Sequence, residues 1–215
     1  MPSPTPARPK VTPEAALAEA TRAMLLAARS LPHGILPGGK DLLTALVYLT
    51  DRSVGGHLPF ESFLRGPHSA IVERELERAI ILGQASSVII RDGRPYDLID
   101  GARTEIRISS RTATAEPGSG WVPGPLAARP ALVTPARRMI RFAEAHPPFA
   151  TTPWAVAAKL VWIRELDAAS ASESLESLAG QLRWANLDEK VRAAGVKLAR
   201  SLAVMPGFGR KLKVG

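Results

Sequence analysis

Apolar positions recur at helical spacing in the first half of the chain. Residues 40–53, KDLLTALVYLTDRS, and residues 68–83, HSAIVERELERAIILG, repeat apolar side chains every three or four positions, as one face of an amphipathic helix does. Residues 58–66, LPFESFLRG, lie between them and predict a short further helix. Glycine readily adopts the left-handed conformation that ends many helices, so the last of the three helices should end at Gly83.

The pattern becomes strand-like after this glycine. Residues 87–100, SVIIRDGRPYDLID, carry β-branched and aromatic residues on both sides of Asp92-Gly93, a dipeptide that readily supplies the two positive φ angles of a type I′ turn. The segment therefore predicts a two-stranded hairpin that turns at this dipeptide. The apolar face of the predicted hairpin consists of Val88, Ile90, Tyr96 and Leu98.

Three helices followed by a hairpin resemble, in element order, the winged helix-turn-helix superfamily over residues 40–108. The resemblance implies a domain in which a helix and a β-ribbon both reach a DNA duplex. Ser69 and Arg74, near the start of the third helix, would then contact base edges. Arg91 and Arg94, on either side of the predicted turn, would approach phosphates or the minor groove.

The N-terminal residues divide into a tail and a helix. Residues 1–10 are rich in proline and predict a disordered tail. Thr12 and Pro13 are the residue types preferred at the N-cap and in the first turn of a helix. This helix has an apolar face that can pack on the winged-helix core or on a second copy of the chain, so a homodimer is left open. The first predicted domain spans residues 11–110.

The second half of the chain predicts a linker and a helical domain. Residues 111–130 lose periodicity and gather proline and glycine, which is typical of a linker. Residues 131–204 show helical spacing throughout and predict a small bundle, with one helix opening at Thr134-Pro135 and another capped by Asn186 with Glu189. The predicted fold class is mainly α with a small β-hairpin: a winged-helix-like domain plus a C-terminal helical bundle.

Charge is distributed unevenly along the chain. The net charge is +8, but residues 1–110 hold 13 basic against 12 acidic residues, whereas residues 111–215 hold 15 against 8. Residues 189–215 alone hold seven basic residues and one acidic residue, as expected of a phosphate-binding surface. The candidate contacts in this stretch are Lys190, Lys197, Arg200, Arg210, Lys211 and Lys213.

Residues 204–211, VMPGFGRK, resemble the hairpin of helix-hairpin-helix domains. The resemblance implies backbone N–H groups that face a DNA phosphate, with Arg210 and Lys211 beside it. Only residues 212–215 follow, where that family has a second helix. The alternative is a basic tail over residues 205–215, after a helix that ends at Pro-Gly.

Other candidate chemistry is sparse. The chain has no cysteine, which excludes disulfides, thiolate metal sites and cysteine nucleophiles. GILPGGK at residues 34–40 has the spacing of a phosphate loop, but Asp41 stands where Ser or Thr would bind magnesium. The four histidines lie near prolines and never four residues apart, and no serine lies in a nucleophile elbow. We therefore expect no enzyme activity, no cofactor and no metal.

Neither a secretory leader nor an apolar stretch of membrane-spanning length is evident, so we expect a cytoplasmic protein without membrane association. The predicted function is non-catalytic nucleic-acid binding, with DNA-binding transcription regulation first. Duplex DNA is the favoured partner, and RNA and single strands are left open. The alternative is a protein-interaction or scaffold subunit of a nucleic-acid-associated complex, because the third helix carries Glu73, Glu75 and Glu77 against two arginines and would repel phosphates.

Overall fold

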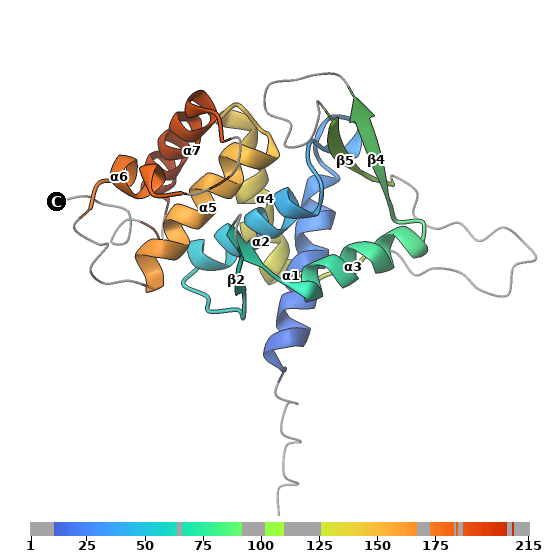
Figure 1. Cartoon of the computed structure of the whole chain (residues 1–215). Helices are drawn as coiled ribbons and strands as arrows, with labels where there is room; N and C mark the ends of the chain where they lie inside the picture. Colours follow the sequence, from blue (N-terminus) through green and yellow to red (C-terminus); the bar gives the residue numbers. More distant parts are fainter. Residues whose placement is uncertain are drawn as a thin grey trace, which may run out of the picture.

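The computed structural model describes residues 11–63, 66–91, 102–109, 126–166, 173–182, 184, 187–205 and 208. The described residues form a mainly helical protein with small antiparallel sheets, which confirms the predicted class at that level (Figure 1). The helices are α1 Pro13–Ala28, α2 Lys40–Ser53, α3 Ala70–Ile81, α4 Pro130–Ala145, α5 Thr151–Leu166, α6 Leu175–Gly180 and α7 Glu189–Leu202, with a 3-10 turn η1 at Pro32–Gly34. The strands are β1 Ile35–Leu36, β2 Glu61–Phe63, β3 Gly66–His68, β4 Ala85–Arg91 and β5 Ala102–Ile108.

Local capping explains where the first helices begin and end. The Thr12 hydroxyl accepts a hydrogen bond from the Ala15 N–H at 3.2 Å, which confirms the predicted start of α1. Helix α2 has the predicted bounds. Helix α3 begins after Ser69, whose hydroxyl accepts from the Ile71 N–H at 3.2 Å, and Gly83 follows its end with a φ of 65°.

The helix predicted over residues 58–66 is wrong. The structure has a small hairpin here, in which β2 pairs with β3 and Glu61 lies opposite His68. Leu58 and Phe60, two positions apart, both pack partly against the core, so the apolar period is that of an extended segment. Gly66 has a φ of 133°, which glycine adopts easily, and it precedes a proline, which disfavours helical backbone.

The main sheet has the order β1-β5-β4, and both pairings are antiparallel. The partner described for β4 is β5, in a register that places Arg91 opposite Ala102. The sequence interpretation had missed residues 102–108 as a strand. The predicted turn at Asp92-Gly93 and its return strand lie outside the described residues. Val88 of the predicted apolar face is half-buried and lies opposite Glu105, whereas the fully buried Ile106 of β5 lies opposite Ser87, on the other face of the sheet.

The C-terminal helices pack directly on the N-terminal ones. Helix α4 contacts α1 and α2, and α5 contacts α2 and α7. The buried apolar side chains form one cluster that extends from Leu17 to Phe208. The predicted division into two domains stays a prediction, since most of the proposed linker lies outside the described residues.

Two helix starts in this half differ from the sequence expectation. Helix α4 begins at Pro130, after an extended Arg129, and Pro135 lies inside it, so the predicted start at Thr134-Pro135 is wrong. The N-cap of α7 is Asp188, whose carboxylate accepts from the Lys190 and Val191 N–H groups at 2.8 and 3.3 Å. The capping role assigned to Asn186 is therefore also wrong, because a carboxylate directly before Glu189 performs it.

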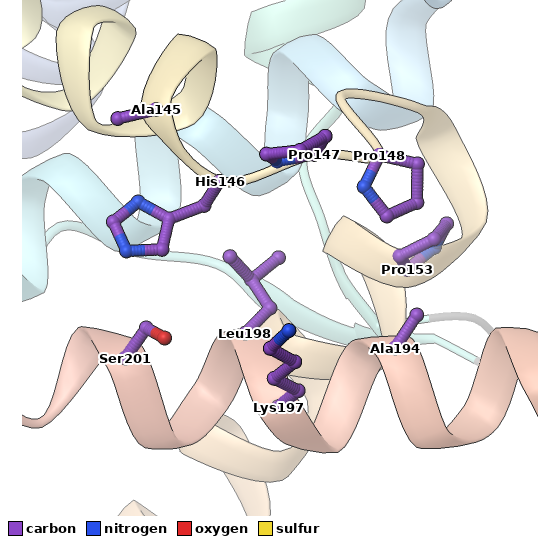
Figure 2. Close-up of a pocket in the computed structure, with 9 residues that line it drawn as sticks. All are labelled: Ala145, His146, Pro147, Pro148, Pro153, Ala194, Lys197, Leu198 and Ser201. Carbon is purple, nitrogen blue, oxygen red and sulfur yellow. The ribbon is translucent and has the colours of Figure 1, made fainter.

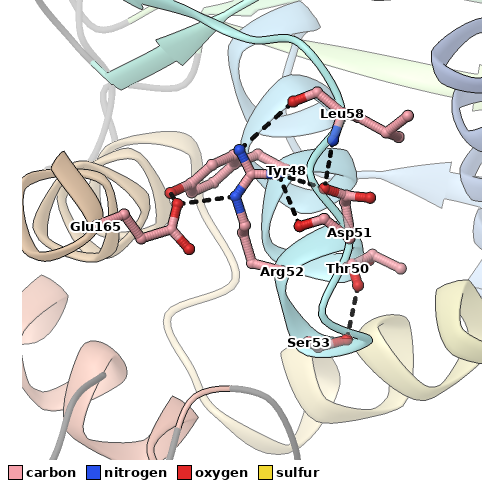
Figure 3. A network of polar contacts seen from close by, with 8 residues as sticks. Tyr48, Thr50, Asp51, Arg52, Ser53, Leu58 and Glu165 are labelled. Atoms are coloured by element: carbon pink, nitrogen blue, oxygen red, sulfur yellow. Dashed lines mark hydrogen bonds and ion pairs between the residues drawn. The ribbon is translucent and has the colours of Figure 1, made fainter. Parts of the chain in front are cut away.

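A buried polar network joins α2 to α5 (Figure 3). Arg52 donates from Nε to Glu165 Oε2 at 2.8 Å, and the Tyr48 hydroxyl donates to the same oxygen at 2.8 Å. Asp51 pairs with Arg52 and accepts from the Leu58 N–H at 3.0 Å. Burial, together with the charge of Glu165, raises the pKa of Tyr48, so its hydroxyl stays protonated as a donor. These groups satisfy one another, and the network positions the segment that leads into β2.

Candidate nucleic-acid interface

The exposed face of α3 is mixed in charge. Arg74, Glu77, Arg78 and Ile81 are exposed, and each lies three or four positions from two of the others, on one side of the helix. The opposite side buries Val72, Leu76 and Ala79 in the core. Figure 1 shows α3 at an edge of the molecule, beside α1.

Glu75 does not belong to this exposed face. Its side chain is 6% exposed, and its Oε2 lies 2.7 Å from Arg22 NH1. Arg22 is on α1, which packs on α3. The expectation that Glu75 would face a phosphate is wrong, because the packing of α1 turns this carboxylate inward and pairs it.

Glu73 is also paired within the protein. Its Oε1 lies 2.8 Å from Lys40 Nζ and 3.8 Å from His68 Nδ1. The hydrogen bond with Glu73 raises the pKa of Lys40 above its ordinary value. Among the three glutamates of α3, Glu77 therefore remains without a partner in the described part of the chain. Two arginines and one unpaired glutamate face outward. The exposed face of α3 is therefore net positive, whereas the sequence predicts a net negative one.

The other predicted contacts near α3 have different positions. Ser69 is 4% exposed and its hydroxyl caps α3, so it is not part of the exposed face. Arg91 is the last residue of β4. Arg94 lies outside the described residues.

Helix α7 carries exposed basic side chains along one stripe. Lys190, Lys197 and Arg200 are exposed and lie at helical spacing. Arg200 forms an ion pair with Glu176 of α6. No carboxylate of the described residues pairs with Lys190 or Lys197. The predicted contacts Arg210, Lys211 and Lys213 lie outside the described residues.

Helix α4 adds basic residues that the sequence interpretation missed. Arg137, Arg138 and Arg141 are exposed, opposite the buried Met139, Ile140 and Ala143. Arg138 and Arg141 share a stripe with Ala145, which lines the same hollow as Lys197. The hydrophobic spacing of residues 130–145 is a signal that would have found them, because it places these arginines on the outer side.

We call Arg138, Arg141, Lys190 and Lys197 the α4–α7 basic surface. Figure 1 shows α7 and α3 on different sides of the molecule, with α2 and α5 between them. The α3 face and the α4–α7 basic surface are therefore two separate places at which a polyanion can bind.

The glycine-rich segment before α2 has a structural role. Gly39 is the N-cap of α2, and a Cβ atom there would lie 3.0 Å from Thr104 Cβ. Lys40 pairs with Glu73, so its amine is already occupied. In the described part of the chain, no cluster of three or more acidic or histidine side chains is placed to hold a metal ion. No helix in the same residues is long and apolar enough to cross a membrane.

No protein-family model, no curated protein and no solved structure matches this chain significantly. The functional argument therefore rests on the residues and geometry of the chain itself.

Proposed function

We propose that this protein binds nucleic acid without catalysis, with duplex DNA as the favoured partner and transcription regulation as its role. The order α1, α2, α3 and then the β4–β5 hairpin supports a winged-helix type of domain, with α1 as one of the three helices in place of residues 58–66. In such a domain α3 is the helix that approaches the major groove.

The observation that carries the proposal is that Glu73 and Glu75 are both paired within the chain, Glu75 buried against Arg22 and Glu73 in a surface ion pair with Lys40. Three glutamates on the outer side would repel a duplex, whereas Arg74 and Arg78 beside a single glutamate attract one. Arginine side chains at this spacing also have the geometry for bidentate contact with guanine.

The α4–α7 basic surface supports the same function in another way. Exposed cations without acidic partners interact with phosphates regardless of sequence. We infer that this surface contributes sequence-independent affinity, while the α3 face contributes discrimination.

The test is a fluorescence-anisotropy titration of the full chain with a labelled duplex, single-stranded DNA and RNA, each at about 50 and 200 mM salt. Binding should weaken steeply with salt, and the duplex should bind best. Salt-independent binding, or none with any of the three probes, would overturn the proposal.

Variants separate the two surfaces. The double change Arg74→Gln/Arg78→Gln should lower the salt slope by about two and reduce discrimination between duplex sequences, since each lost phosphate contact removes about one counterion. Arg74→Lys/Arg78→Lys is the matched control, because it keeps both charges and removes the guanidinium geometry; the slope should stay and discrimination should fall. Arg138→Gln/Arg141→Gln should weaken binding equally for all sequences.

A protein partner is a second candidate function. Ile81 is 79% exposed on α3, and Ile89 is 68% exposed on β4. Exposed apolar side chains of this size are more typical of a docking surface than of a phosphate-binding one. Loss of salt-dependent binding in the titration would favour this candidate.

A further inference from the structure

A hollow of about 290 Å³ lies between the C-terminal end of α4, the first turn of α5 and the middle of α7 (Figure 2). Its wall is mostly apolar and includes the rings of Pro147, Pro148 and Pro153. The remaining lining residues are Ala145, His146, Ala194, Lys197, Leu198 and Ser201.

Two polar groups of the hollow, the Lys197 amine and the Ser201 hydroxyl, are donors without acidic partners in the described residues. Lys197 and Ser201, one turn apart on α7, both line it, and Figure 2 shows the Lys197 side chain extending from α7 toward the prolines. Within the described part of the chain, neither the Lys197 amine nor the Ser201 hydroxyl has a hydrogen-bond or ion-pair partner. No carboxylate lines the hollow. The charge of the wall therefore selects an anion.

His146 forms a fixed part of the wall. Its Nδ1–H donates to the Phe142 carbonyl oxygen at 2.8 Å, and its ring stacks on the Phe142 ring with 4.0 Å between centroids. The imidazole orientation is thus set by α4 before any ligand arrives. Such a wall is preorganised, which lowers the free-energy cost of binding.

The lining also indicates the size of the ligand and the character of its uncharged part. Proline rings present flat apolar faces on which an aromatic ring packs with little loss of conformational freedom. The volume is at the small end of the range for ligand sites, which favours a small ligand. The lining contains no arginine, the residue that most often recognises phosphate in a bidentate manner.

We propose that this hollow is a binding site for a small aromatic carboxylate, with the carboxylate at Lys197 and Ser201 and the ring against the prolines. The site is independent of the α3 face. Because Lys197 also belongs to the α4–α7 basic surface, an occupied site neutralises one of the cations there.

The test uses phenylacetate as the probe, with phenylacetamide and inorganic phosphate as comparisons. Isothermal titration calorimetry of the full chain should give a dissociation constant of about 1 mM or below for phenylacetate, as expected for a ligand of this size. Phenylacetamide keeps the shape without the charge and should bind at least about fivefold more weakly. Phosphate should bind no better than the amide. Equal binding of acid and amide, or no binding of the acid at 10 mM or so, would overturn the proposal.

Two variants locate the site and one serves as a control. Lys197→Gln should weaken phenylacetate binding by about fivefold or more, because it removes the counter-charge. Ala194→Leu places a larger apolar side chain in the hollow and should abolish binding, while nucleic-acid affinity stays unchanged because no charge is altered. Lys190→Gln removes the same charge from the same helix two turns away, outside the lining, and should bind phenylacetate like the parent protein.

The outcomes keep this site distinct from the proposed function, because calorimetry with phenylacetate requires no nucleic acid. Weakening by Lys190→Gln equal to that by Lys197→Gln would show a general electrostatic effect and overturn the site. Unchanged binding in Ala194→Leu would place the ligand elsewhere, with the same consequence.

Discussion

The α3 face and the α4–α7 basic surface carry charge in different ways. Helix α3 has three glutamates and two arginines, yet two of its carboxylates are paired within the chain: Glu75 is buried against Arg22, and Glu73 forms a surface ion pair with Lys40. On the α4–α7 basic surface the cations are exposed, and in the described part of the chain no carboxylate pairs with its four members. Counting charges along the sequence therefore gives the sign of the α4–α7 basic surface, although it does not single out Arg138 and Arg141, and it gives the wrong sign for the α3 face.

Whether the sequence predicts the charge of a surface depends on how far apart in the sequence the residues that determine it are. Arg22 and Glu75 are 53 positions apart, and only the packing of α1 on α3 brings them together. The arginines of α4 lie outward because Met139, Ile140 and Ala143, on the same helix, are buried. A short-range pattern can place a charge on an outer face, whereas a charge that is neutralised from another helix needs the fold.

The prediction with the largest expected effect tests whether the side of α3 that carries Glu75 is buried. Leu76 is 6% exposed and lies on the buried side of α3 with Glu75. Leu76→Ala should lower the free energy of unfolding by about 2–5 kcal/mol, through lost burial and the cavity left behind. Urea unfolding followed by circular dichroism measures it. Ile81→Ala is the control on the exposed side of the same helix and should change stability by no more than about 0.5 kcal/mol. Similar costs for the two variants would mean that the buried side of α3 is wrongly assigned.

A smaller effect separates the inward carboxylate from the outward one. Glu75→Gln should lower the free energy of unfolding by about 1–2 kcal/mol, because it removes the charge that pairs with Arg22. It should leave nucleic-acid affinity nearly unchanged. Glu77→Gln is the matched variant on the exposed face: stability should stay within about 0.5 kcal/mol, and duplex affinity at low salt should rise severalfold.

The two readouts, urea unfolding and anisotropy titration, are independent of each other. Equal gains in duplex affinity from the two glutamine variants would contradict the assignment of Glu75 to the interior. An unchanged affinity in Glu77→Gln would place the duplex away from α3 and leave the α4–α7 basic surface as the main contact.

Short-range signals predicted much of the fold and part of the candidate site. The bounds of α2, the start of α1 and the end of α3 follow from local periodicity and from caps such as Thr12 and Gly83. Residues 58–66 were misread because a segment of nine residues fits a helical and an extended period about equally well. Strand β5 was missed because its pairing with β1 and β4 is a long-range contact. Arg138 and Arg141 were within reach of the sequence, whereas the burial of Glu75 was not.

The smallest expected effect concerns the ion pair that connects the two regions. Glu19 of α1, the helix on which α3 packs, accepts from Arg129 Nε at 2.5 Å and from the Arg129 N–H at 3.2 Å, directly before α4. The hydrogen bond from the Arg129 side chain lowers the pKa of Glu19 below its ordinary value. A carboxyl group with a lowered pKa in the folded state contributes stability above its unfolded pKa, and the contribution disappears as the pH falls through the folded value. Glu19→Gln should therefore reduce the melting temperature by about 1–2 °C at pH 7, and the difference from the parent protein should shrink as the pH falls and vanish below the lowered pKa of Glu19. Glu144→Gln removes an exposed carboxylate from α4 that lacks a partner in the described residues, and should show no such pH-dependent difference. If the melting temperature of Glu19→Gln stayed below that of the parent protein by the same amount at low pH, the Glu19 side chain would stabilise the contact between α1 and α4 by packing and not by its charge.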